Sequence, residues 1–271
     1  MDHPLQAWRD TLGDLGVLGL VREAPAAPVP PAVPERRAQA QAAPIVTPVP
    51  PRQGPPAYVP PTAPGACPSA EVVAGCDSLE ALQQAVSGCL ACPLGGGRIK
   101  LVFGEGDPQA RLLFVGEGPG RDEDLQGRPF VGKAGELLDK MIGALGLKRE
   151  QTYITNVVMC RPPDNRVPAP EEARACLGYL RRKLELIQPA VIVTLGATPL
   201  RELLGVSEGI TRVRGQWRRL QVGDREIPVM PTFHPAYVLR QYTQDVRRAV
   251  WEDLQAAKAW LDRPDGPTAG R

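Results

Sequence analysis

Apolar runs alternate along this chain with stretches in which apolar residues recur at helical spacing. Short continuous apolar runs bounded by turn residues predict buried strands, whereas longer amphipathic stretches predict helices. We expect strands at residues 111–115, 152–157, 190–195, 218–222 and 226–231. We expect helices at residues 79–86, 134–145, 170–187, 199–204 and 244–261. Strands that alternate with helices indicate an α/β fold with three αβα layers around a mostly parallel sheet.

The N-terminal part of the chain lacks this alternation. Residues 1–22 place Trp8 and several leucines at helical spacing, which predicts a short amphipathic element that docks a protein partner. Residues 23–77 are dominated by proline and alanine, a composition that cannot bury a core and that predicts a disordered, extended tether. We therefore expect one globular domain over residues 78–262, with a flexible tail at residues 263–271.

The charge and hydropathy of the chain say more about its cellular compartment than about its function. A formal net charge of +2 over 271 residues neither demands nor excludes a nucleic-acid partner, so a basic surface must be local, with Arg128, Arg166, Arg214 and Arg240 among its candidates. No run of eighteen apolar residues occurs, and the start of the chain lacks a hydrophobic signal core. We therefore expect a cytoplasmic protein without membrane contact, in which six cysteines favour metal ligation or burial over disulfides.

Four of the cysteines have a spacing that suits a metal centre. Cys89 and Cys92 form a C-x-x-C-P motif, and Cys160 and Cys176 follow much later in the chain. Two thiolates on one loop and two remote thiolates can surround either a [4Fe–4S] cluster or a structural zinc ion. The spacing alone leaves both metals open, together with simple burial of free thiols. Cys67 and Cys76 have no evident ligand partner and are interpreted as incidental.

A glycine-rich loop at residues 116–135 directly follows the apolar run at residues 112–115. Its glycines expose backbone N–H groups, and Phe130 adds one large flat side chain, a combination that suits a planar heterocycle. Asn156 and His234 also follow strand-like runs, and the carboxyl ends of parallel strands meet at one edge of a sheet. Taken singly, each has a structural explanation: a core ring, a turn former and a satisfied histidine.

Together, the loop, Asn156, His234 and the four cysteines resemble the iron–sulfur uracil-DNA glycosylases of family 4, over residues 78–262. The resemblance implies a uracil-DNA glycosylase-like fold with four strands in a mostly parallel central sheet. It also implies a [4Fe–4S] cluster bound by Cys89, Cys92, Cys160 and Cys176. The implied activity is hydrolysis of the N-glycosidic bond of uracil in single- or double-stranded DNA, which leaves an abasic site for base excision repair. We expect a monomer.

The resemblance assigns roles to residues of the loop and the strand ends. Phe130 would stack on the extruded base, Asn156 would pair with uracil O4 and N3–H, and His234 would donate to O2 as charge develops there. A backbone N–H near Gly118 would assist His234. Gly118 stands where a related family carries a water-activating aspartate, which leaves Glu117 as the carboxylate that could orient water.

Further features of the sequence bear on specificity and on competing functions. Glu123 is expected to line the pocket near uracil C5 and to help refuse thymine. No histidine occurs in residues 161–168, where a covalent-trapping relative carries one, so turnover is expected. One alternative is a non-catalytic iron–sulfur module that binds nucleic acid or assists a polymerase. A zinc protein with a phosphate-binding loop is disfavoured, because residues 116–120 lack the G-x-x-x-x-G-K-[ST] pattern.

Overall fold

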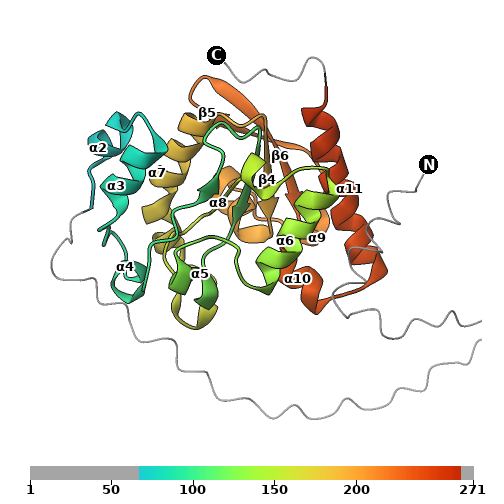
Figure 1. Ribbon diagram of the computed structural model, residues 1–271, viewed down its shortest axis with the longest axis horizontal. Helices are drawn as coiled ribbons and strands as arrows, with labels where there is room; N and C mark the ends of the chain where they lie inside the picture. Colours follow the sequence, from blue (N-terminus) through green and yellow to red (C-terminus); the bar gives the residue numbers. More distant parts are fainter. Residues whose placement is uncertain (1–66, 264–271) are drawn as a thin grey trace, which may run out of the picture. The chain divides into compact units, whose positions relative to one another are not determined.

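The computed structural model describes residues 67–263, which form the α/β unit drawn in colour in Figure 1. The amphipathic element at residues 1–22, most of the tether, and residues 264–271 lie outside the described residues, so the predicted docking role stays a prediction. No helix among residues 67–263 is long and apolar enough to cross a membrane.

The sheet has six strands in the order β1-β3-β2-β4-β6-β5. Their bounds are β1 Glu105–Gly106, β2 Leu112–Gly116, β3 Tyr153–Asn156, β4 Val191–Leu195, β5 Arg218–Val222 and β6 Arg225–Thr232. The four central strands β3, β2, β4 and β6 are parallel, as expected, and β1 and β5 add antiparallel edges. All five predicted strands are present. The two-residue strand β1 was not predicted, because so short a segment has no periodicity.

The register of the central strands brings their carboxyl ends to one edge of the sheet. Gly116 at the end of β2 lies opposite Asn156 at the end of β3, and Leu195 at the end of β4 lies opposite Thr232 at the end of β6. Every residue of β2, β3 and β4 is buried, because helices cover both faces of the sheet. The loops that leave this edge therefore rest on a rigid core.

Helices form the outer layers. The longer ones are α3 Leu79–Val86, α6 Lys133–Ala144, α7 Pro170–Ile187, α8 Ala197–Leu204 and α11 Gln244–Leu261. The shorter ones are α2 Ala70–Gly75, α4 Leu94–Gly97, α5 Arg121–Gln126, α9 Ile210–Val213 and α10 Pro235–Arg240, with the 3-10 turns η1 Arg149–Gln151 and η2 Pro163–Asn165. Figure 1 shows α2, α3 and α7 on one side of the sheet and α6, α10 and α11 on the other.

The five longer helices match the predicted ones, and the differences lie in short elements. Helix α2 falls inside the range expected to be tether: Ser69 caps it, and Val73 and Cys76 are buried. The folded unit therefore begins before residue 78, the boundary that we expected. Helix α5 lies inside the glycine-rich loop, where no helix was expected, because its polar residues show no apolar face.

Candidate active site

A cavity of about 720 Å³ lies at the edge of the sheet where the parallel strands end. We call it the strand-end cavity. The six residues proposed from the sequence all line it: Glu117, Gly118, Glu123, Phe130, Asn156 and His234. They come from the loops after β2 and β6 and from the last position of β3, so they meet beyond the carboxyl ends of the parallel strands, where ligands of such sheets bind.

Asn156 contributes a buried amide to this cavity. Asn156 is 2% exposed, and its Oδ1 atom has no hydrogen-bond partner among the described residues. The neighbouring Gly116 makes room for it, because a Cβ atom on Gly116 would collide with Asn156 Oδ1 and come within 2.6 Å of Phe130 Cζ. An unpaired buried acceptor costs about 1–3 kcal/mol, so this oxygen is suited to a ligand that donates to it.

Phe130 places its ring beside the same glycine. The residue is 6% exposed and has a φ of 52°, which is unusual for a residue with a side chain. Its ring centroid lies 5.6 Å from that of His234, with the planes tilted by 31°. A backbone held in a sparsely populated region at a cavity wall is typical of a preorganised site.

His234 is held as a neutral hydrogen-bond donor. It caps α10, and its Nδ1 atom accepts from the backbone N–H of Ala236 at 3.1 Å. Burial, assisted by the nearby Arg240 cation and opposed by Glu123, lowers the pKa of His234 to about 4. With Nδ1 acting as an acceptor in a neutral ring, the proton resides on Nε2. The side chain can therefore donate without being charged.

Two glutamates of the loop make different contacts. Glu117 accepts a hydrogen bond at 2.5 Å from Thr198, a cavity residue at the start of α8 that the sequence analysis missed. Glu123 accepts from the backbone N–H groups of Gly120, Val131 and Gly132 at 2.9–3.0 Å. Glu123 thus organises the loop, which the sequence did not suggest. Its expected role at uracil C5 stays a prediction.

Gly118 has no room for a side chain. A Cβ atom there would lie 2.7 Å from Val158 Cγ2, and 3.7–3.8 Å from Pro162 and Pro168. The loop that follows β3 packs directly over this glycine. An aspartate at residue 118 would therefore require the Val158 side chain to shift.

The arginines proposed for a basic surface fall into two groups. Arg166 and Arg240 line the strand-end cavity, together with Arg201, which the sequence analysis did not single out. Arg214 instead forms a buried ion pair with Asp253, and Arg128 pairs with Glu105 away from the cavity. Only the first group is placed to meet a phosphate backbone at the rim.

The four cysteines come together from distant parts of the chain. Cys89, Cys92, Cys160 and Cys176 are all buried. A hydrogen bond from the Cys176 thiol lowers the pKa of Cys92 to about 7, and the same contact together with burial raises the pKa of Cys176. Burial raises the pKa of Cys160, to which Arg98 donates at 3.5 Å. Charge interactions also connect Cys160 with Cys89 and Cys92.

The arrangement of the four thiols does not by itself decide between a single ion and a cluster. No group of three or more His, Cys, Asp or Glu side chains within residues 67–263 has the geometry of a metal-ion site. A zinc ion requires four sulfurs at about 2.3 Å from one centre, whereas a four-iron cluster separates its ligands more widely. Four buried thiols from distant parts of the chain can serve as ligands of either kind of centre. Cys67 and Cys76 have other contacts, with the Tyr179 hydroxyl and the Val72 carbonyl.

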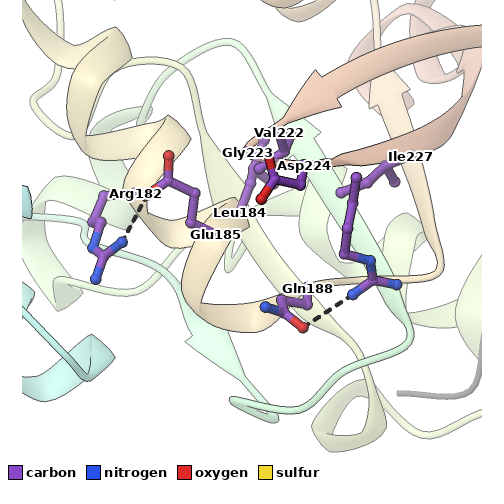
Figure 2. A pocket seen from close by; sticks show the side chains of 9 residues that line it. Arg182, Leu184, Glu185, Gln188, Val222, Gly223, Asp224 and Ile227 are labelled. Atoms are coloured by element: carbon purple, nitrogen blue, oxygen red, sulfur yellow. Dashed lines mark hydrogen bonds and ion pairs between the residues drawn. The ribbon is translucent and has the colours of Figure 1, made fainter. Parts of the chain in front are cut away.

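A second, smaller hollow of about 400 Å³ lies between the C-terminal end of α7 and the β5–β6 turn, and we call it the hairpin hollow. Figure 2 shows that charged and amide side chains line it. Arg182 pairs with Glu185 at 2.7 Å, and Arg225 donates to Gln188 at 3.0 Å. None of the residues proposed from the sequence lies here.

Comparison with known proteins identifies the family. The model of the uracil-DNA glycosylase superfamily matches residues 103–255. A type-4 uracil-DNA glycosylase of Thermotoga maritima is 47% identical over 189 residues, which cover 68% of this chain and 95% of that protein. The chain belongs to the type-4 uracil-DNA glycosylases. Relatives of the same name from Sulfurisphaera tokodaii and Archaeoglobus fulgidus are 45% and 43% identical, over 66% of this chain and 83% and 91% of their own.

The region matched by the superfamily model contains the residues that line the strand-end cavity of this type-4 glycosylase. All six residues proposed from the sequence lie between residues 103 and 255, as do Cys160 and Cys176. The cavity combines a flat ring, an amide with a free acceptor and a neutral imidazole donor. These three groups can hold a planar ring that carries both an N–H donor and carbonyl acceptors.

Proposed function

We propose that the strand-end cavity receives a uracil extruded from DNA and that Phe130, Asn156 and His234 recognise it there. As a uracil-DNA glycosylase, the chain hydrolyses the N-glycosidic bond of uracil in DNA, releases the free base and leaves an abasic site for repair. The observation that carries the residue assignment is the unpaired, buried Oδ1 atom of Asn156 beside the Phe130 ring. A uracil stacked on that ring would supply the missing donor.

Asn156 accounts for the choice between uracil and cytosine. Its Oδ1 atom would accept from uracil N3–H, while its amide N–H would donate to uracil O4. Cytosine reverses both groups, because it has an amino donor at C4 and an acceptor at N3. The Asn156 acceptor would then face the acceptor at cytosine N3, and the Asn156 donor would face the amino group. Each mismatch leaves a buried polar atom without a hydrogen bond, which costs free energy.

His234 accounts for the stabilisation of the leaving group. When the bond between C1′ and N1 breaks, its electron pair moves onto the uracil ring and negative charge gathers on O2. The Nε2–H of His234 would donate to that oxygen more strongly than to the ground-state carbonyl. A water molecule adds its oxygen to C1′, and the proton that it loses passes through solvent to the uracil anion, which leaves as the neutral base. We assign the orientation of this water to Glu117. One of its carboxylate oxygens accepts from Thr198, and the other would contact the water.

The DNA backbone would be held at the rim of the cavity. Arg201 and Arg240 line the cavity beside Thr198 and Tyr237 and would neutralise phosphates on either side of the extruded nucleotide. Contacts of this kind position the strand without reading its sequence. They are compatible with both single- and double-stranded substrates, acted on by a monomer.

We propose further that Cys89, Cys92, Cys160 and Cys176 bind a [4Fe–4S] cluster. When bound, the cluster supplies a covalent cross-link among the segment before α4, the loop after β3, and α7, and it does not take part in bond cleavage. The protein should then be brown and contain four irons and four sulfides per chain. Replacement of Cys176 by serine should lower both contents, and a colourless protein with one zinc per chain would reject the cluster.

Base release tests the catalytic proposal. Matched oligonucleotides that carry uracil, cytosine or thymine at one position are incubated with the full chain, as single strands and as duplexes. Free uracil should appear from the uracil substrates alone. If the protein bound these oligonucleotides but released no base, it would be a non-catalytic nucleic-acid-binding module instead.

A further inference from the structure

Arg149, which does not line the strand-end cavity, holds the backbone at Phe130. Arg149, in the turn η1, is only 12% exposed in its side chain. Its Nη2 donates to the carbonyl oxygen of Pro129 at 2.5 Å, and its Nη1 donates to that of Phe130 at 3.2 Å. The guanidinium also contacts Asp139 at 2.7 Å and Glu105 at 3.1 Å. These carboxylates balance the charge of an otherwise buried cation.

The two residues after Phe130 are held by Glu123 through their backbone N–H groups. Glu123 accepts from the N–H groups of Val131 and Gly132, at 2.9 and 3.0 Å. The carbonyl oxygens of residues 129 and 130 therefore accept from a cation, and the N–H groups of residues 131 and 132 donate to an anion. Gly135 closes in on the Phe130 carbonyl so tightly that any side chain there would collide with it.

These contacts explain how Phe130 keeps a φ of 52°. A left-handed backbone at a residue with a side chain costs about 1–3 kcal/mol and persists only where its surroundings over-determine it. Arg149 is the contact that acts on the carbonyl of Phe130 itself and on the one before it. Without the guanidinium, the peptide could relax toward an ordinary conformation, and the ring would leave its place beside Asn156.

Arg149 also anchors the strand that carries Asn156. Its backbone carbonyl accepts from both the N–H and the hydroxyl of Thr152, the residue just before β3. Asn156 is the last residue of that strand. One residue therefore joins the support of the Phe130 ring to the start of the strand that bears the Asn156 amide.

We propose that Arg149 is a positioning residue for uracil recognition, which acts by holding Phe130 in the geometry that stacks on the base. This inference rests on the proposed function, because it takes Phe130 as the stacking surface. Arg149 itself touches neither the base nor the reacting atoms. A displacement of the ring by a fraction of an ångström would weaken the binding of uracil without removing any group that contacts it.

Arg128 provides a matched control. It forms two hydrogen bonds with the same carboxylate, Glu105, at 2.6 and 2.8 Å. Its side chain is 55% exposed, and within residues 67–263 no hydrogen bond joins it to the backbone of residues 129–132. An exposed ion pair contributes about 0–1 kcal/mol, so its loss should be small. Comparison of Arg149→Met with Arg128→Met thus separates support of the Phe130 backbone from pairing with Glu105.

The experiment measures competitive inhibition of the full-length enzyme by free uracil, with a single-stranded oligonucleotide as substrate. Arg149→Met should raise the inhibition constant of uracil about tenfold or more and lower kcat/KM. Arg128→Met should leave both within about twofold of wild type. Arg149→Lys keeps the charge but loses the planar fork, so it should give an intermediate inhibition constant. This variant replaces Arg149→Met if the latter does not fold. Wild-type inhibition constants in the folded Arg149 variants would overturn the proposal.

A double variant decides whether Arg149 acts through Phe130. In a Phe130→Ala background, Arg149→Met should add nothing to the inhibition constant, because the ring it positions is gone. If the two effects multiplied in full, Arg149 would act elsewhere and the inference would be wrong. If Phe130→Ala alone left inhibition by uracil unchanged, Phe130 would not be the stacking surface. That result would reject the proposed site, and with it the role of Arg149.

Discussion

The strand-end cavity and the hairpin hollow differ in what their polar groups do. In the strand-end cavity, Asn156 Oδ1 has no partner within the described residues, and His234 uses Nδ1 for its helix and keeps Nε2 for the cavity. In the hairpin hollow, Arg182 and Gln188 already pair with neighbouring side chains (Figure 2). A ligand would supply the partner that Asn156 lacks in the first, whereas in the second it would compete with the pairs that Arg182 and Gln188 already form. Free polar groups in a buried wall thus identify the active site better than the mere presence of a hollow.

The largest effect should come from the loss of the His234 donor. Serine at this position can still cap α10, because serine is a preferred N-cap residue, but its hydroxyl is too short to replace Nε2. His234→Ser should lower kcat by about 10²–10³-fold, as expected when one donor to a developing anion is removed. The melting temperature should stay close to that of wild type. A rate within threefold of wild type would remove His234 from catalysis.

The next effect should come from the Asn156 amide. Asn156→Ala leaves the N3–H and O4 groups of uracil without partners in a buried site, at a cost of about 1–3 kcal/mol. We therefore expect kcat/KM for uracil excision to fall roughly 5- to 150-fold. Preference for uracil over cytosine, measured with matched oligonucleotides, should fall as well. Unchanged preference would mean that another group reads this edge of the base.

A smaller effect should appear in the pH dependence of folding. The pKa of His234 is about 4 in the folded protein, against about 6.5 in an unfolded chain. Between these values the unfolded state binds the extra proton, so the contribution of this group to stability is complete above pH 6.5 and is lost as the pH falls toward 4. In urea unfolding at pH 7 and pH 5, wild type should lose more stability than His234→Ser. Equal losses would contradict a buried neutral histidine.

The smallest effect should come from the hairpin hollow. Gln188 hydrogen bonds with Arg225 at the surface and is not among the residues that line the strand-end cavity. Gln188→Ala should leave kcat and KM within about twofold of wild type, in keeping with substitutions of exposed surface groups. A marked loss of activity in this variant would blur the contrast between the two hollows. It would also give the hairpin hollow a role in binding DNA.

Much of the fold could be predicted from the sequence, because its main elements carry strong local signals. The apolar run of β4 and the proline that opens α7 fix their positions almost by themselves. Helix α5 could not be predicted, because it has no apolar face and its carboxylates, Glu123 and Asp124, accept from backbone N–H groups outside the helix. The early start of the domain at α2 was hidden for a similar reason, since only one of its residues is buried.

Only those residues of the proposed site whose side chains face the ligand could be predicted from the sequence. Phe130, Asn156 and His234 follow strands, so the topology of a parallel sheet brings them together. Arg149 acts on backbone carbonyls, and no side-chain pattern in a sequence records which carbonyl a distant arginine will meet. The packing over Gly118 was equally invisible, because the loop that fills that space begins forty residues later, at Val158.

The structure of the protein with free uracil tests the central claim most directly. A crystal of the full enzyme soaked in uracil should show the base stacked on Phe130, with N3–H donating to Asn156 Oδ1 and O2 accepting from His234 Nε2. The Asn156 acceptor would then have the partner that it lacks in the protein alone. Uracil bound in the hairpin hollow, or in the strand-end cavity without contact to Asn156 and His234, would contradict the account.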